Sequence, residues 1–202
     1  MRRVVVLALL ALALALPMAA WADGIVLVNQ FGSIGISDAG ISSTQSQLTQ
    51  FNGIVAPKGH SLGSVSFTTG ALVSGSIAAG GVFSSTGSTF VVIGKGNYGE
   101  PKGTIFSGSF VGPVDWTLTS KVGGKLTYTL SGTISGMLYD GRMVTGTTSQ
   151  TIYSTNGQIA AGIGHIRVGS TNLPVPEPGT LGLLGTGLVG IAGMFRRKLI
   201  GS

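Results

Sequence analysis

The 202-residue sequence contains no cysteine. That absence excludes disulfide bonds, thiolate metal ligands and cysteine nucleophiles together. Charged residues make up only 9% of the chain. The two histidines, His60 and His165, are far apart in the sequence and lie in no pattern of metal-ligand spacing. We therefore expect no metal ion and no cofactor.

The net charge of +6 is concentrated at the two ends of the sequence. Between residues 23 and 175, seven Lys and Arg face five Asp and Glu, which leaves +2 spread along the chain. A nucleic-acid partner is therefore not expected, although a pI near 10 is typical of one. The other cations flank apolar segments and indicate membrane topology: Arg2, Arg3, Arg196, Arg197 and Lys198.

The first 22 residues have the three parts of a secretory signal peptide. A basic start is followed by an uncharged apolar run over residues 4–16, and Pro17 ends that run. Ala20 and Ala22 then form an A-x-A cleavage site before Asp23. We predict a signal helix over residues 1–22 that passes through the secretion machinery and is removed.

A second motif lies at residues 176–198. Pro176 and Pro178 hold the backbone around Glu177 extended, because each proline fixes φ and keeps the preceding residue out of the helical region. An uncharged apolar stretch follows over residues 181–195, and Arg196, Arg197 and Lys198 come after it. The positive-inside rule keeps that basic cluster cytoplasmic, so the preceding domain lies outside.

This order of features resembles the PEP-CTERM sorting signal of Gram-negative bacteria that make exopolysaccharide or biofilm. The resemblance implies an exosortase as partner and Pro176, Glu177, Pro178, Arg196, Arg197 and Lys198 as the sorting residues. It also implies transient anchoring in the inner membrane by a transmembrane helix within residues 180–202, then delivery to the cell surface or extracellular matrix. Residues 169–179 are the expected linker. A plain tail anchor with an incidental proline-rich linker is the alternative.

The domain between these ends, residues 23–168, is predicted to be all-β. Alternating apolar and small polar residues recur between turn signals and indicate eight to ten strands, too many for one open flat sheet. We expect an antiparallel sandwich or barrel that ends in a four-stranded meander over residues 112–168. Its turns are Gly123-Gly124, a type I′ turn at Asp140-Gly141, and Asn156-Gly157. The other predicted strands are 24–31, 41–55, 63–77, 80–86, 88–94 and 103–111.

Two aromatic residues of the meander, Trp116 and Tyr128, permit two interpretations. They lie on strand faces that otherwise carry Val, Leu and Ile, which favours a place in the core. If they were exposed, they would form a platform for stacking against sugars. Gly132 and Gly136, on the same face, would make room for Trp116 or another large side chain.

Two short motifs resemble catalytic or cofactor signatures. Residues 94–99 match G-x-G-x-x-G, but Pro101 and a strand pattern follow where a nucleotide site needs a helix, so we expect a hairpin loop. Residues 59–63 match G-x-S-x-G without the helix of a nucleophile elbow. If this were a serine hydrolase, Ser61 would be the nucleophile, His165 the base, and Asp115 or Asp140 the group that orients it.

The sequence therefore favours an exported, non-enzymatic β domain with a structural or adhesive role. A carbohydrate- or exopolysaccharide-binding module is the first alternative, and a serine hydrolase around Ser61 is the second. The three readings differ in whether aromatic rings gather on the surface and whether Ser61 meets His165.

The signal-peptide assignment predicts the first residue of the exported protein. Cleavage after Ala22 leaves Asp23 at the N-terminus, and mass spectrometry of protein recovered outside the inner membrane measures it directly. Recovery of intact Met1, or of a start well inside the β domain, would contradict the assignment.

Overall fold

The computed structural model describes residues 24–154 and 163–175, and within them it contains twelve strands and no helix. No element of that described part is therefore an apolar helix long enough to cross a membrane. The predicted signal helix and transmembrane helix lie outside the described residues. The strands are β1 (Gly24–Gln30), β2 (Ser33–Ser37), β3 (Gly40–Phe51), β4 (Ile54–Val55), β5 (Gly63–Thr68), β6 (Leu72–Ser76), β7 (Gly80–Phe83), β8 (Thr89–Gly94), β9 (Gly103–Val122), β10 (Lys125–Leu138), β11 (Met143–Ser154) and β12 (Ile163–Pro174).

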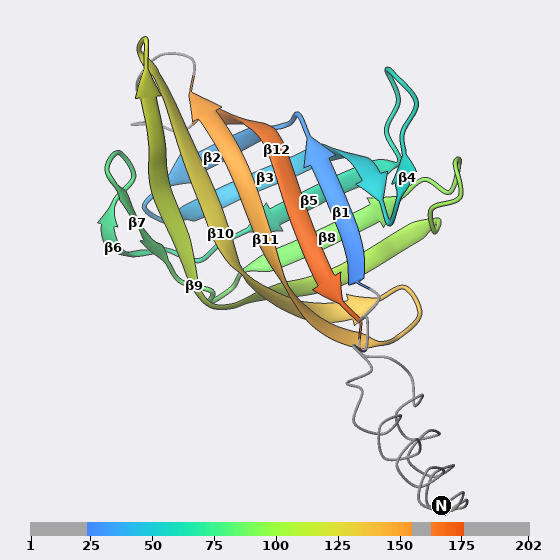
Figure 1. The fold of residues 1–202 in the computed structure, drawn as a ribbon. Coiled ribbons are helices and arrows are strands. Elements are labelled where there is room, and N and C mark those ends of the chain that lie inside the picture. The colour runs from blue at the N-terminus through green and yellow to red at the C-terminus, as the bar shows by residue number, and fades with distance from the viewer. Residues whose placement is uncertain (1–23, 155–162, 176–202) are drawn as a thin grey trace, which may run out of the picture. The chain divides into compact units, whose positions relative to one another are not determined.

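Eight strands form a closed antiparallel barrel, in the order β1-β3-β5-β8-β9-β10-β11-β12. The ring closes where β1 pairs with β12, from Gly24 opposite Pro174 to Asn29 opposite Gly169. Figure 1 shows these two strands side by side, although they come from opposite ends of the described sequence. The all-β prediction is confirmed, and of the two predicted architectures the barrel is the one observed.

The predicted meander is present as β9, β10, β11 and β12, each paired with the next. The hairpin at Asp140-Gly141 also forms, but its turn differs from the predicted type I′. Only Gly141 has a positive φ, +82°, and its N–H donates to the carbonyl of Leu138. Since type I′ needs positive φ at both central residues, this is the three-residue loop in which a type I turn is followed by a left-handed glycine.

The remaining strands differ from the prediction in five places. The two strands predicted on either side of residue 112 form the single long strand β9, and the segment predicted as 63–77 divides into β5 and β6. The short strand β4 was not predicted, nor was β2, which continues the line of β1 after Phe31 and Gly32, both with positive φ. Finally, β12 continues to Pro174, past the expected start of the linker.

The barrel interior is mainly apolar and aromatic. Phe67, Phe90 and Phe110 contact one another with ring centroids 6.0 to 6.4 Å apart. Trp116 and Tyr128 are buried and stack at 4.5 Å, with their planes 4° apart. The core interpretation of these two residues is therefore confirmed. Gly132 makes room for a large neighbour as expected, and that neighbour is Phe110.

A polar network crosses the interior where the barrel closes. Asn29 Nδ2 donates to Ser46 Oγ at 2.8 Å and to Gln150 Oε1 at 2.9 Å. Gln150 Nε2 donates in return to Asn29 Oδ1 and to Thr148 Oγ1, and Thr148 bonds Thr171 at 2.9 Å. All five side chains are buried. Because each buried polar group has a partner, the network avoids the desolvation cost of an unpaired amide.

Gly169 is predicted to be essential for this network. It stands between Asn29 and Gln150 in the cross-strand row, and a Cβ at this position would overlap the side-chain oxygens of both. We expect Gly169→Ala to lower the free energy of unfolding by about 2–4 kcal/mol, through overpacking and broken buried hydrogen bonds. Urea unfolding measures the change. The exposed neighbour Ser170→Ala is the control and should change it by less than about 0.5 kcal/mol; equal effects would contradict this account.

Candidate functional site

The outer face of β9–β12 carries a polar hollow of about 420 Å³. Side chains that point away from the core line most of it, because residues alternate between the two faces of each strand. It lies beside Gly112 and Pro113, where the pairing register between β9 and β10 shifts. The residues that line it are Pro113, Asp115, Ser131, Gly132, Thr133, Thr147, Thr148, Ser149, Ser170 and Asn172.

Strand register arranges these side chains in two rows across the sheet. Asp115 is opposite Ser131, which is opposite Ser149, which is opposite Ser170. The second row runs from Thr133 through Thr147 to Asn172. Neighbouring members of a row are separated by the strand spacing of about 4.8 Å. The hollow therefore presents a regular grid of hydroxyl, amide and carboxylate groups.

The outward side chains of both rows make no hydrogen bond to another protein group within the described ranges. Thr148, which also lines the hollow, is buried and belongs to the interior network. Their capacity to bond a polar ligand is therefore available. The alternation of Thr and Ser along residues 127–135 predicted a hydroxylated face. The alignment of Asp115, Ser149 and Ser170 with this face was not predicted, because it depends on the register of four strands.

No aromatic platform accompanies the hollow. Trp116 is buried in the core, and no aromatic residue lines the hollow. Tyr98 lies on the loop between β8 and β9, Tyr139 on the turn between β10 and β11, and Tyr153 on β11 beside the His165 ring. None of these rings lines the hollow, so any sugar held in the hollow would be held by hydrogen bonds and not by stacking.

The G-x-G-x-x-G segment is the loop between β8 and β9, as predicted, and β9 begins directly after it. Its conformation depends on Glu100, which is buried. Asn97 N donates to one carboxylate oxygen at 3.0 Å and Tyr98 N to the other at 2.9 Å. Burial works to raise the pKa of Glu100, but these backbone donors outweigh it and hold the pKa below its ordinary value. The ionised carboxylate thus fixes the loop from inside.

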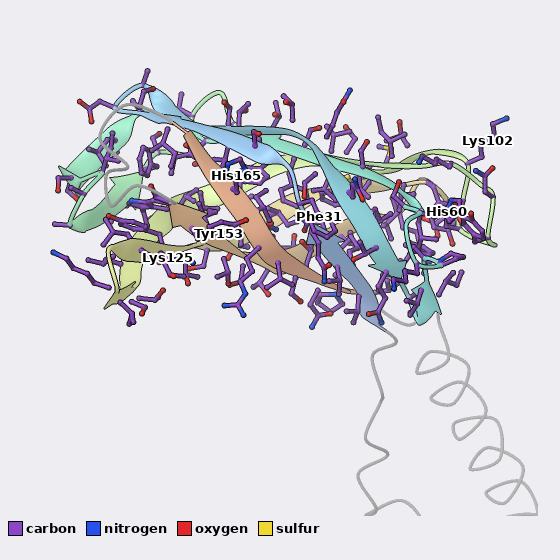
Figure 2. All side chains as sticks on the ribbon, turned by 90° about the horizontal axis from the view of Figure 1, so that it is seen from above. Phe31, His60, Lys102, Lys125, Tyr153 and His165 are labelled. Atoms are coloured by element: carbon purple, nitrogen blue, oxygen red, sulfur yellow. The ribbon has the colours of Figure 1, made fainter. Side chains whose placement is uncertain are left out.

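The structure does not bring Ser61 and His165 together. Ser61 precedes β5 at one end of the barrel, where its Oγ accepts a hydrogen bond from Lys95 Nζ at 2.7 Å. His165 lies near the start of β12, and Figure 2 places it well away from His60, the neighbour of Ser61. The side-chain partner of Ser61 is therefore an exposed lysine and not His165.

The two aspartates considered as the group that orients His165 have other places in the structure. Asp115 lines the hollow on the outer face of β9. Asp140 accepts a hydrogen bond from Arg142 Nε at 2.7 Å, and this bond holds the pKa of Asp140 below its ordinary value. In residues 24–154 and 163–175, no group of three or more His, Asp and Glu side chains could hold a metal ion.

The predicted cleavage residues Ala20, Ala22 and Asp23 lie outside the described residues, as do the six sorting residues of the tail. Comparison with curated proteins and with solved structures finds no match to the chain. The family model of the PEP-CTERM protein-sorting motif matches residues 174–198, which confirms the resemblance seen in the sequence. The chain therefore carries a PEP-CTERM motif, the mark of an exported protein that an exosortase sorts at the membrane.

Proposed function

We propose that this protein is a surface or extracellular-matrix protein of a Gram-negative bacterium, with a non-enzymatic barrel in a structural or adhesive role. In this proposal residues 1–22 direct export, and residues 180–202 anchor the protein until an exosortase processes the tail. The basic residues after the apolar stretch set the orientation of the anchor. The barrel is then released or transferred to the cell surface.

The observation that carries this proposal is how close the sorting motif lies to the barrel. Val175 is buried against the core, and the Pro-Glu-Pro motif begins with the next residue. The tail therefore follows the folded domain with no intervening domain, as suits a domain that is itself the cargo. The separation of Ser61 from His165 further supports a role without catalysis.

Replacing Glu177 tests the sorting step. If the tail is a sorting signal, Glu177→Ala should accumulate in the inner membrane at its unprocessed mass, whereas wild type loses its tail in a host that has the exosortase. The substitution leaves the apolar stretch intact, so a plain anchor would be unaffected. Cell fractionation with mass spectrometry measures both outcomes.

Two further variants provide a control for this experiment and a test of the basic cluster. Thr180→Ala, outside the Pro-Glu-Pro motif, is the control and should be processed like wild type. Replacing Arg196, Arg197 and Lys198 with glutamine should impair processing, because the orientation of the anchor is loosened. Equal tail removal in wild type and Glu177→Ala, or none in either, would favour the plain anchor.

A second candidate function is binding of exopolysaccharide, favoured by the hollow on β9–β12. Sugars offer a dense set of hydroxyl groups, and the two rows of the hollow offer matching donors and acceptors that have no partner among the described residues. A single contact of this kind, exposed and without stacking, is weak. A polymer that presents many repeats would strengthen it through multivalency when many barrels gather along it.

Removing hydroxyl groups from the hollow tests this candidate. We expect Ser131→Ala, Thr147→Val and Ser149→Ala together to weaken binding of exopolysaccharide purified from the producing strain by at least about tenfold, since three hydrogen bonds are lost. Surface substitutions of this kind should leave the unfolding free energy nearly unchanged.

The matched control removes three hydroxyl groups from outside the hollow, in Ser64→Ala, Thr104→Val and Ser107→Ala. A glycan affinity measurement, such as calorimetry or retention on immobilised polymer, compares the two triple variants. Equal retention by wild type and both variants would rule out the hollow as the glycan site.

A further inference from the structure

One end of the barrel carries Gly24 and Val175, the first and last residues that the structure describes. Consecutive strands of the ring alternate in direction, so loops 52–62, 95–102 and 139–142 lie at the same end as Gly24 and Val175. We call these three loops and the adjoining strand ends the tail rim. Backbone hydrogen bonds of 2.8 Å join neighbours around it, from Asn52 to Val26, from Lys95 to Leu62 and from Tyr139 to Ile105.

The tail rim carries three exposed lysines, Lys58, Lys95 and Lys102. Figure 2 shows Lys102 and His60 at one end of the barrel, with Lys125 toward the opposite end. The two acidic residues of the rim are already engaged. Glu100 accepts backbone donors from its own loop, and Asp140 pairs with Arg142, the one ion pair in the part of the chain that the structure describes. The lysine charges therefore face outward without a carboxylate partner.

Exposed apolar side chains occur at several places on the barrel, among them Phe31, Val73 and Val122, and a further set lies on the tail rim. Of the described tyrosines and methionines, all those with strongly exposed side chains lie here: Tyr98, Tyr139, Met137 and Met143, with exposed fractions of 39% to 62%. Val55 on β4 is 64% exposed. Tyrosine is enriched where a protein meets lipid headgroups, because its ring is apolar and its hydroxyl is polar. Lysine stems extend along such a surface while their charges reach the phosphates.

The length of the connecting segment limits how far this rim can be from a membrane. Only residues 176–180 separate Val175 from the apolar stretch that begins at Leu181. Even fully extended, this span reaches at most roughly 20 Å. Screening by physiological salt has a length of about 8 Å, so the lysines attract anionic headgroups only when the rim is close to the membrane surface, and a connecting segment this short permits that approach.

We propose that, while the tail is anchored, the tail rim lies on the membrane surface and binds anionic phospholipid headgroups. Lys58, Lys95 and Lys102 contact the phosphates, and the exposed tyrosines and methionines enter the headgroup layer. This inference rests on the proposed function, in which residues 181–195 form the anchor. The contact would hold the barrel in one orientation and keep the Pro-Glu-Pro segment at the membrane surface, where the processing enzyme acts.

The absence of cysteine allows a direct test on the full chain. A fluorophore on Asn97→Cys reports the tail rim, and one on Ala39→Cys, in the turn between β2 and β3, reports the opposite end. The full chain is reconstituted into phosphatidylcholine vesicles, with or without phosphatidylglycerol, that carry a headgroup quencher. We expect quenching at residue 97 only, stronger with phosphatidylglycerol, and reduced near 1 M salt, where the screening length falls to about 3 Å.

Two triple variants distinguish the effect of the rim lysines on membrane binding from the effect of the protein's net charge. Lys58→Gln, Lys95→Gln and Lys102→Gln together should reduce the membrane-bound population of the rim at least about tenfold relative to the unbound population, since each basic residue near an anionic surface contributes about 1 kcal/mol. Replacing Lys121, Lys125 and Arg167 with glutamine removes the same charge from elsewhere on the barrel and should leave quenching unchanged.

The outcomes distinguish this inference from the proposed function. If the full chain does not float with the vesicles, both the anchor and the rim contact are overturned. If it floats but residue 97 is not quenched, or is quenched no more than residue 39, only the rim contact is overturned. Equal effects of the two triple variants would also overturn it. So would lysine-dependent capture of soluble alginate with no lipid-dependent quenching, which would assign the rim to an acidic glycan.

Discussion

The pairing of β1 with β12 is the interaction on which the rest of the structure depends. It joins the first and last described strands and converts a curved sheet with two open edges into a ring. An open edge of this length would expose unpaired backbone groups and invite pairing with other chains. The same pairing places Gly24 opposite Pro174, so the first and last described strands have these ends at one end of the barrel.

The polar network explains how that pairing is specified. A shift of one residue between two strands would turn every side chain to the opposite face. Such a shift at the β1–β12 pairing would move Asn29 away from Gln150 and leave buried amides without partners. The apolar residues around them are similar in character and would tolerate a shift more easily. Hydrogen bonding between Asn29, Gln150 and Ser46 therefore supplies register information that apolar packing alone lacks.

The features predictable from the sequence are those set by neighbouring residues. The meander was predictable from the alternation along residues 126–138 and from the Asp140-Gly141 turn. The burial of Trp116 and Tyr128 was predictable because the other residues on their strand faces are apolar. Ring closure was left open between sandwich and barrel, because it depends on strands separated by most of the domain. The interruption between β1 and β2 follows from a positive φ at Phe31 and Gly32, and the pattern of side chains gives no sign of it.

The candidate sites also differ in whether neighbouring residues alone define them. The sorting motif is a linear signal, so the sequence was sufficient to recognise it. The hollow and the tail rim are assembled from four strands and three loops, and their residues are ordinary hydroxyl and lysine side chains that carry no local signature. Strand order and register bring them together. The G-x-S-x-G match around Ser61 is local and carries no information about His165, which lies far from it in the fold.

The stack of Trp116 on Tyr128 gives the barrel an internal optical probe. Trp116 Nε1 donates to the carbonyl of Ile77 at 2.8 Å, and the Tyr128 hydroxyl donates to the carbonyl of Ala78 at 2.7 Å. Both acceptors belong to the turn of the β6–β7 hairpin. Strand β7 of this hairpin pairs with β9 between Val114 and Thr117. Cleavage after Ala22, as predicted, would remove Trp21 and leave Trp116 as the single tryptophan of the exported chain. The emission wavelength and quenching of Trp116 would then report whether the β6–β7 hairpin is packed against the barrel, without any added label.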